Sequence, residues 1–282
     1  AGLRGPIPDD PSALLPGPFD LPRVLRRPGP SPVAPGVTRR FLLAQVKPRL
    51  LHMSRLTAGL PAPAEPLGGL EAPVNELRGH YLGHYLSALA KMSKSLGDAD
   101  LKARGDRLVA ELAACQQKIG NGYLSAFPEE FFDRVEKLQR VWAPYYTLHK
   151  IYAGLLDTYV YCDNPQALAV CKQFADWVIA RNSKLTDEQM QRMLGNEHGG
   201  MNECLANLYG LTGEEKYLKI ALRFNHQALV GPFSKRQDNL TGKHANTQFP
   251  KFIGAAREYE LTGDESLRTA AAFFWETVVR ER

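Results

Sequence analysis

The sequence lacks long apolar runs, and this absence limits what kind of protein it can be. No run approaches the roughly 18–20 residues that a helix needs to span a bilayer, so we expect no membrane partner. Basic clusters are equally short, as at 26–27 and 39–40, and are too small for a nucleic-acid arm. The chain does not open with a signal peptide, although a mature chain or a fragment would lack one too. Localisation therefore stays open, a periplasmic or secreted protein being one option, and so does the oligomeric state.

Cysteine is scarce as well, and its spacing indicates no site. None of the four cysteines, at 115, 162, 171 and 204, belongs to a Cys-x-x-Cys pair. Neither a zinc motif nor a redox motif is therefore indicated. We interpret all four as free thiols, with a disulfide between Cys162 and Cys171 as the less favoured alternative.

Proline is abundant, but it is unevenly distributed. Ten of the twenty prolines fall within residues 1–35. Proline lacks an amide hydrogen and interrupts helices, so we predict that residues 1–36 form an extended arm. The rest, residues 37–282, has ordinary globular composition and is predicted to form the main domain.

From residue 75 onward, the spacing of apolar residues predicts helices, without the alternation typical of strands. Each predicted helix pair is divided by a short turn rich in Gly, Asp or Asn. The four pairs are 79–117, 145–180, 199–229 and 244–279, which break at Gly97-Asp98, Asp163-Asn164-Pro165, Gly213-Glu214 and Gly263-Asp264. The third and fourth turns are near-copies, LTGEEKYL and LTGDESLR. Such repetition indicates an all-α fold of stacked helical hairpins, either a solenoid or a closed toroid.

The first helix of each pair begins with polar residues. In GHYLGHYL (79–86), two histidines four residues apart share one helix face, where they can bind a metal, contact a polar ligand or lie in a core. If the hairpins pack in parallel register, these helix starts meet at one end and form a pocket for a small ligand. The candidate ligand-binding residues are His80, His84, His149, Asn202, Glu203, His244 and Asn246. Aromatic neighbours that could stack on a sugar ring are Tyr81, Tyr85, Trp142, Tyr145, Tyr146 and Phe249.

Simpler interpretations compete with this pocket. A single histidine on an apolar face is usually a core residue with one hydrogen bond, and we interpret His52 and His226 as core or surface residues of this structural kind. A zinc site at His80 and His84 would need a third ligand, and no His-Glu-x-x-His sequence supplies one. The pair Gly199-Gly200 is compatible with close packing or with a helix start. Glu203 favours a ligand, because an unpaired carboxylate on an apolar face is costly to bury.

Five segments resemble one family, in the same order. The chain is similar to the catalytic domain of the bacterial β-L-arabinofuranosidase-type glycoside hydrolases, families 127 and 146, formerly a domain of unknown function. The resemblance runs from about Pro18 to the last residue. The segments are GHYLGHYLSAL, GNGYLSAFPEEFFDR, VWAPYYTLHKIYAGLLDTY, GGMNECLANLYGLTG and HANTQFPKFIGAAREYELTGD.

This resemblance implies an (α/α)6 toroid followed by β-sandwich domains. It also implies release of terminal L-arabinofuranose from plant-type glycans with retention of configuration. In the family, a glutamate is the general acid/base and a zinc-bound cysteine is the nucleophile, with zinc held by one glutamate and three cysteines. The metal lowers the pKa of the attacking thiol, and the acid protonates the departing oxygen.

The chain departs from the family pattern at its end. The family's catalytic glutamate and its zinc ligands follow the segment that matches Phe273–Val279, and no cysteine follows Cys204. We therefore expect about four hairpins of an incomplete toroid, with catalytic residues and zinc ligands beyond residue 282 and no zinc bound by this span. Two smaller departures are Leu70, where the family usually has tryptophan, and Cys204, usually aliphatic, which we do not assign as the nucleophile.

Three functions remain open from the sequence. The first is a β-L-arabinofuranosidase-like glycosidase that is inactive as an isolated fragment. The second is a non-catalytic carbohydrate-binding helical protein. The third is an α/α-toroid sugar epimerase in which paired histidines act as acid and base without a metal.

Overall fold

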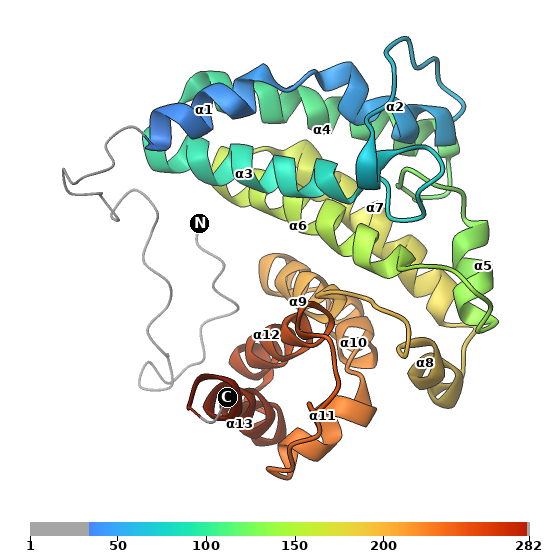
Figure 1. Cartoon of the computed structure of the whole chain (residues 1–282), viewed down its shortest axis with the longest axis vertical. Coiled ribbons are helices and arrows are strands. Elements are labelled where there is room, and N and C mark those ends of the chain that lie inside the picture. The colour runs from blue at the N-terminus through green and yellow to red at the C-terminus, as the bar shows by residue number, and fades with distance from the viewer. Residues whose placement is uncertain (1–33, 281–282) are drawn as a thin grey trace. The chain divides into compact units, whose positions relative to one another are not determined.

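In the computed structural model, residues 34–280 are described, and within this range the secondary structure is entirely helical (Figure 1). The elements are α1 (Ala34–Ala44), α2 (Lys47–Thr57), η3 (Gly69–Glu71), α3 (His80–Leu96), α4 (Ala99–Ile119), α5 (Glu130–Glu136), α6 (Pro144–Cys162), α7 (Pro165–Asn182), α8 (Asp187–Met193), α9 (Met201–Thr212), α10 (Glu215–Arg223), α11 (Gln227–Ser234), α12 (Ala245–Thr262) and α13 (Glu265–Arg280). The predicted all-α class is confirmed.

The predicted breaks agree with the observed ones. Helix pairs α3–α4, α6–α7, α9–α10 and α12–α13 are divided at the four turns that the sequence indicated. One boundary differs, because α1 begins at Ala34, so residues 34–36 of the predicted arm are helical. The remainder of that arm, residues 1–33, lies outside the described residues. That residues 37–282 form one domain stays a prediction.

The two near-copy turns are equivalent in detail. Gly213 and Gly263 both end their helices in the left-handed conformation, each with φ of 70°. The hydroxyls of Thr212 and Thr262 accept a hydrogen bond from the amide two residues later, at 3.3 and 3.2 Å. Glycine adopts this conformation without steric cost, so the repeat in sequence is a repeat of helix-ending chemistry.

The chain divides into two compact units, which we describe separately. Within the described residues, unit 1 comprises 34–128 and 150–174, so it holds α1 to α4, most of α6 and the first part of α7. In this unit α1 and α2 lie against α3 and α4 (Figure 1). Its core is formed by leucines of α3 and α4 and by Tyr152 and Phe174, whose rings stack 5.2 Å apart.

Two glycines allow α3 and α6 to approach closely in unit 1. A Cβ atom on Gly83 would lie 2.1 Å from the backbone carbonyl of Lys150, and one on Gly154 would lie 2.5 Å from the carbonyl oxygen of Gly83. Any side chain at either position would therefore collide with backbone. Nearby, the Lys91 ammonium and the Asp157 carboxylate pair at 2.9 Å. The second glycine of GHYLGHYL is thus explained by helix packing.

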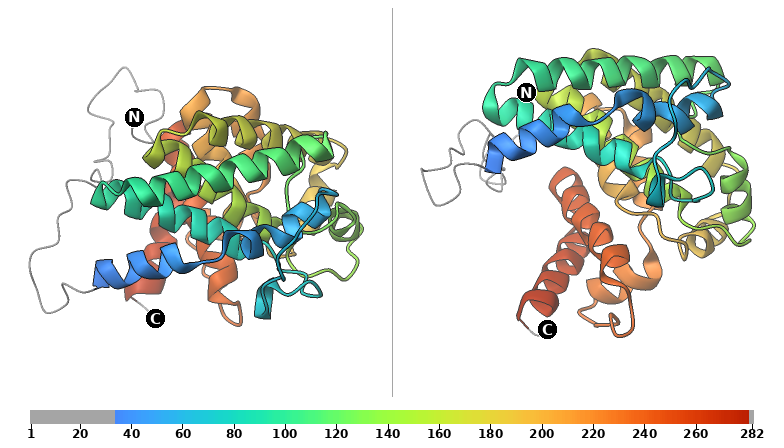
Figure 2. Two further views of the ribbon diagram at one scale, coloured as in Figure 1. Left: turned by 90° about the horizontal axis from the view of Figure 1, so that it is seen from above. Right: turned by 45° about the horizontal axis from the view of Figure 1, so that its top comes forward.

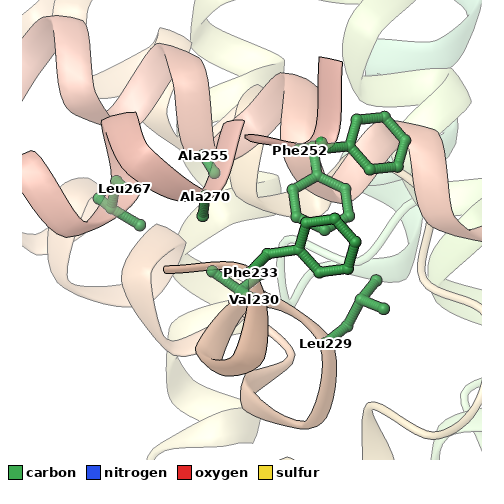
Figure 3. Packing of buried hydrophobic residues seen from close by; sticks show 8 residues of the cluster. Leu229, Val230, Phe233, Phe252, Ala255, Leu267 and Ala270 are labelled. Atoms are coloured by element: carbon green, nitrogen blue, oxygen red, sulfur yellow. The ribbon is translucent and has the colours of Figure 1, made fainter. Parts of the chain in front are cut away.

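Unit 2 comprises residues 129–149 and 175–280 within the described range. Helix α9 packs against α10 and α12, and α13 packs against α11 and α12. The α12–α13 hairpin is seen clearly in Figure 2. One apolar cluster joins α11, α12 and α13, with Phe233 against Phe252 (Figure 3) and the rings of Phe252 and Phe274 stacked 4.0 Å apart.

Two expectations drawn from absences can be compared with the structure. Within residues 34–280, no helix combines the length and the apolar character required to cross a membrane. All four cysteines are free thiols, so the alternative disulfide between Cys162 and Cys171 is not formed.

Candidate functional site

The first group of predicted residues lies at the start of α3 in unit 1. His80 is the first residue of the helix and is partly buried, whereas His84, one turn later, is exposed. Their imidazole rings lie 6.0 Å apart, edge to face. The sequence prediction that both histidines share one face of the helix is therefore met.

A carboxylate outside the helix holds this start in place. Glu71 accepts hydrogen bonds from the amides of Gly79, at 2.6 Å, and Tyr81, at 2.9 Å. Its Oε1 also lies 2.8 Å from Nδ1 of His80. We call Glu71, His80 and His84 the α3 site.

The environment keeps His84 neutral. Although the residue is partly accessible, desolvation by the surrounding protein lowers the pKa of its imidazole to about 4, and the positive charge of Lys150 and the neighbouring His80 act in the same direction. A neutral imidazole can donate from one nitrogen and accept at the other. This is the pattern required to contact sugar hydroxyl groups.

The second group lies in unit 2, where the buried imidazole of His149 on α6 lies against Gly199 and Gly200. A Cβ atom on Gly199 would come within 2.3 Å of Nδ1 of His149. Gly199 also has φ of 57°, a conformation that glycine adopts without strain. Gly199, and to a smaller extent Gly200, leaves room for the imidazole.

Glu203 reaches the same point from the first turn of α9. A Cβ atom on Gly200 would lie 3.0 Å from Nε2 of His149 and 3.2 Å from Oε2 of Glu203. The thiol of Cys204 hydrogen-bonds the backbone oxygen of His149 at 3.6 Å, which fastens α9 to α6. We call His149, Gly199, Gly200 and Glu203 the glycine-loop site.

The loop from Leu194 to Gly200 links this site to its surroundings. The Asn196 amide donates to the backbone oxygens of Val141 and Trp142, at 3.1 and 2.6 Å, just before α6 begins. Glu197 accepts a hydrogen bond from Asn246 at 3.1 Å. One loop therefore connects the starts of α6, α9 and α12.

His244 and Asn246 lie at the exposed start of α12. His244 is the N-cap residue, but its side chain makes no capping hydrogen bond. Asn246 is held by Glu197, as described above. Both positions are accessible to a ligand, which is compatible with their predicted role.

Asn202 is placed differently from the prediction, since it is completely buried. Its Nδ2 donates to Oδ1 of Asn225 at 3.1 Å and to the backbone oxygen of Lys251 at 3.0 Å. Gly254 makes room, because a Cβ atom there would lie 2.1 Å from that nitrogen. Asn202 therefore has a structural role between α9 and α12, and we leave it out of the proposed sugar contacts.

Two ionisable groups of α12 in the same unit are buried. Desolvation raises the pKa of Glu258 to about 8, although a 2.6 Å hydrogen bond from Asn225 opposes the shift. Desolvation also lowers the pKa of Lys251 to about 8. The Lys251 ammonium hydrogen-bonds Nδ1 of His226 and Oε1 of Gln248, both at 3.1 Å. His226 thus has a partner inside the protein, in agreement with its interpretation as a structural residue.

The aromatic candidates separate into two groups. Tyr85 and Tyr145 are core residues; the hydroxyl of Tyr85 accepts a 2.6 Å hydrogen bond from Arg104, and the ring of Tyr145 packs against Phe132. Neither can stack on a ligand, which corrects that expectation. The partly or well exposed rings are those of Tyr81, Trp142, Tyr146 and Phe249.

Sequence reasoning missed several residues that organise the two sites. Glu71 was not among the candidates, because it contacts α3 from the separate segment η3 and its hydrogen bonds depend on tertiary structure. Asn196 and Glu197 could have been noticed, since they belong to the polar run GNEHGG directly before α9. Lys251 and Glu258 lie on a helix with mixed polar and apolar residues, where sequence does not show which side is buried.

The described residues do not fit a metal site. Within 34–280, no group of three or more His, Cys, Asp and Glu side chains is arranged to hold a metal ion. Burial also raises the pKa of the Cys115 thiol to about 11 and of Cys162 and Cys171 above the ordinary value. Protonated thiols are poor ligands and poor nucleophiles, so we derive no chemical step through zinc.

The described residues form helical hairpins whose first helices begin with polar residues, with accessible aromatic rings nearby in the sequence. The family model for the β-L-arabinofuranosidase GH127 catalytic domain matches residues 36–282, and the chain belongs to this family. It is a family of glycoside hydrolases, as the sequence resemblance implied.

Among solved structures, the chain is similar to a GH127 β-L-arabinofuranosidase from Geobacillus stearothermophilus T6. The TM-score is 0.62 and the sequence identity is 16%, over 88% of this chain and 44% of that chain. This likeness shows the fold, and the chain spans less than half the length of the relative. No curated protein matches the chain significantly.

Proposed function

We propose that this chain contributes sugar-binding residues to a glycosidase that releases terminal L-arabinofuranose from plant-type glycans. The observation that carries the proposal is the glycine-loop site. His149 and Glu203 come from different helices, and both present polar atoms to one point above Gly200. Gly199 and Gly200, which have no side chains, leave room for the imidazole at that point.

The donor set suits the hydroxyl groups of a sugar. The Glu203 carboxylate is a strong hydrogen-bond acceptor, and an imidazole can donate or accept according to its tautomer. His84 in the α3 site is neutral at neutral pH and offers the same versatility. We propose His80, His84, His149, Glu203, His244 and Asn246 as the sugar contacts, with Trp142, Tyr146 and Phe249 as rings against which a sugar can stack.

Bond cleavage is not assigned to these residues. In the family the acid/base is a glutamate, and a cysteine is activated by zinc, which lowers the pKa of its thiol. The cysteines of this chain are buried, and the Cys204 thiol is hydrogen-bonded to the His149 backbone. We propose that the catalytic groups and the zinc ligands belong to a further part of the catalytic domain.

A binding titration tests this proposal. We would follow p-nitrophenyl β-L-arabinofuranoside binding to the chain by calorimetry and compare Glu203→Gln and His149→Gln with the unchanged protein. Each substitution is expected to weaken binding about tenfold, since a hydrogen bond to a charged group contributes roughly 1.5–3 kcal/mol. Glu188→Gln, at an exposed glutamate of the same unit, is the matched control and is expected to bind normally.

Two results would contradict the proposal. The first is normal binding by both Glu203→Gln and His149→Gln. The second is turnover by the chain with added zinc, which would place the nucleophile within this span. No turnover with intact binding is the expected result.

A further inference from the structure

Helix α3 begins without a cap of its own. Its N-cap residue is Gly79, which has φ of 96° and no side chain to accept hydrogen bonds from the first amides. Those amides lie in a buried part of unit 1, because Leu77, Arg78 and Gly79 are all buried. Unpaired buried amides are costly, so the helix requires an acceptor from elsewhere.

The carboxylate of Glu71 supplies that acceptor and also contacts His80. Oε2 accepts from the Gly79 amide at 2.6 Å, while Oε1 accepts from the Tyr81 amide at 2.9 Å and lies 2.8 Å from Nδ1 of His80. The negative charge also suits the positive end of the helix dipole. One side chain therefore serves the helix and the imidazole together.

The loop that carries Glu71 is itself well fixed. Asn75 accepts a hydrogen bond from the Leu77 amide at 2.9 Å through its side chain, and its backbone oxygen accepts from Arg78 at 2.9 Å. Arg78 also donates to the backbone oxygen of Ala126 at 2.8 Å. The position of the carboxylate is thus determined by tertiary contacts.

We propose that Glu71 is a positioning residue of the α3 site. It fixes the direction of the His80 imidazole and, together with the Leu77 backbone oxygen 2.9 Å from the same nitrogen, keeps the proton on Nδ1. Nε2 is then the accepting nitrogen of the neutral ring, suited to a sugar hydroxyl that donates. This inference rests on the proposed function only in taking a sugar as the ligand of His80.

A residue that only caps the helix would behave differently. Loss of a cap lowers stability but leaves the imidazole tautomer unchanged. Loss of a positioning residue raises the share of the Nε2–H tautomer as well, because only the Leu77 backbone oxygen then requires a proton on Nδ1, whereas the carboxamide of glutamine can donate to Nδ1 or accept from it. The tautomer of His80 therefore separates the two roles.

The test uses the full chain with ¹⁵N-labelled histidine at pH 8.5, with the His80 signal assigned from His80→Gln. In the unchanged protein, long-range ¹H–¹⁵N correlations are expected to show the proton on Nδ1. In Glu71→Gln, a mixture of tautomers is expected, and sugar binding weakens by about tenfold, as for loss of a charge-assisted hydrogen bond. Glu65→Gln, at an exposed glutamate of the same segment, is the control and changes neither.

Two outcomes would overturn the proposal. One is a proton on Nε2 of His80 in the unchanged chain, and this measurement does not depend on whether any variant folds. The other is an unchanged tautomer in a folded Glu71→Gln chain. If the unchanged chain binds no arabinofuranoside, the proposed function fails, whereas the tautomer measurement still decides the role of Glu71.

Discussion

The α3 site and the glycine-loop site use similar residues but hold them by different means. In the α3 site, a carboxylate binds the helix start and one imidazole, so electrostatic contacts fix the geometry. In the glycine-loop site, the imidazole of His149 packs against two glycines, so its position depends on the space that these residues leave free. Glycine appears in both, but Gly79 supplies a backbone conformation, whereas Gly199 supplies conformation and space.

This difference predicts which kind of substitution should disrupt each site. The α3 site, which depends on the Glu71 carboxylate, should be sensitive to removal of that charge. The glycine-loop site should be sensitive to any atom added to its glycines. The loss of stability depends on whether the group next to the added atom can move. The following substitutions separate these cases.

The largest effect is expected at Gly83, beneath the α3 site. In Gly83→Ala the new Cβ atom would lie 2.1 Å from the Lys150 backbone, which cannot yield. We expect a loss of roughly 3 kcal/mol or more in the free energy of unfolding, measured by chemical denaturation. Gly97→Ala is the control; no atom lies within 4 Å, and only its φ of +66° opposes alanine, for a loss of about 1 kcal/mol. Equal losses would contradict the packing argument.

The next effect concerns Glu258, a buried residue of α12 that accepts a hydrogen bond from Asn225. Its pKa is raised from 4.5 to about 8 in the folded chain, so between these values the unfolded chain loses a proton that the folded chain retains. This group therefore makes the free energy of unfolding fall as pH rises from 4.5 to 8.

Substitution by glutamine should remove that fall. The free energy of unfolding of Glu258→Gln, relative to the unchanged chain, is expected to increase as pH rises from 4.5 to 8 in urea titrations. Glu260→Gln, an exposed position on the same helix, is expected to show no such trend. A pH-independent difference for Glu258→Gln would refute the assignment of a protonated buried carboxyl.

A smaller effect on stability, with a clear effect on binding, is expected at Gly199. The Cβ atom of Gly199→Ala would lie 2.3 Å from Nδ1 of His149, and a side chain can rotate away where backbone cannot. We expect a loss of about 1 kcal/mol in stability from the positive φ and about tenfold weaker sugar binding. Unchanged affinity in calorimetry would show that His149 does not contact the ligand.

The smallest effect is expected at Trp142, which is 46% exposed and whose backbone oxygen accepts a hydrogen bond from Asn196. Removing a stacking ring costs about 0.5–1.5 kcal/mol, so Trp142→Ala should weaken sugar binding about fivefold. Of the three tryptophans, only Trp142 is a proposed sugar contact. The change in tryptophan fluorescence on sugar binding should therefore disappear in this variant. Trp275→Phe, at another exposed tryptophan, should retain it.

Much of the fold was predictable because its signals are local. The turns at Gly97, Gly213 and Gly263 were located from glycine followed by an acid, which is helix-ending chemistry contained in a few residues. The helices α5, α8 and α11 were not singled out. They are only seven or eight residues long, too short for apolar periodicity to stand out.

The candidate site was predictable only in part. Polar residues at helix starts identified His149 and Glu203, which the structure brings to one point. The same reasoning included Asn202, which is buried, because one turn of helix carries neighbouring residues to opposite sides. Tyr85 and Tyr145 were misjudged for the same reason.

The sequence by itself determined the helical hairpins, their turns and the family, since these depend on local spacing and on motifs read in order. Only the tertiary structure decided which polar groups are accessible and which are buried in the core. It also decided what holds them, because Glu71 acts on a helix start eight residues away and Gly254 makes room for a side chain on another helix. Such contacts depend on how helices pack, and the spacing of residues within a single helix does not encode them.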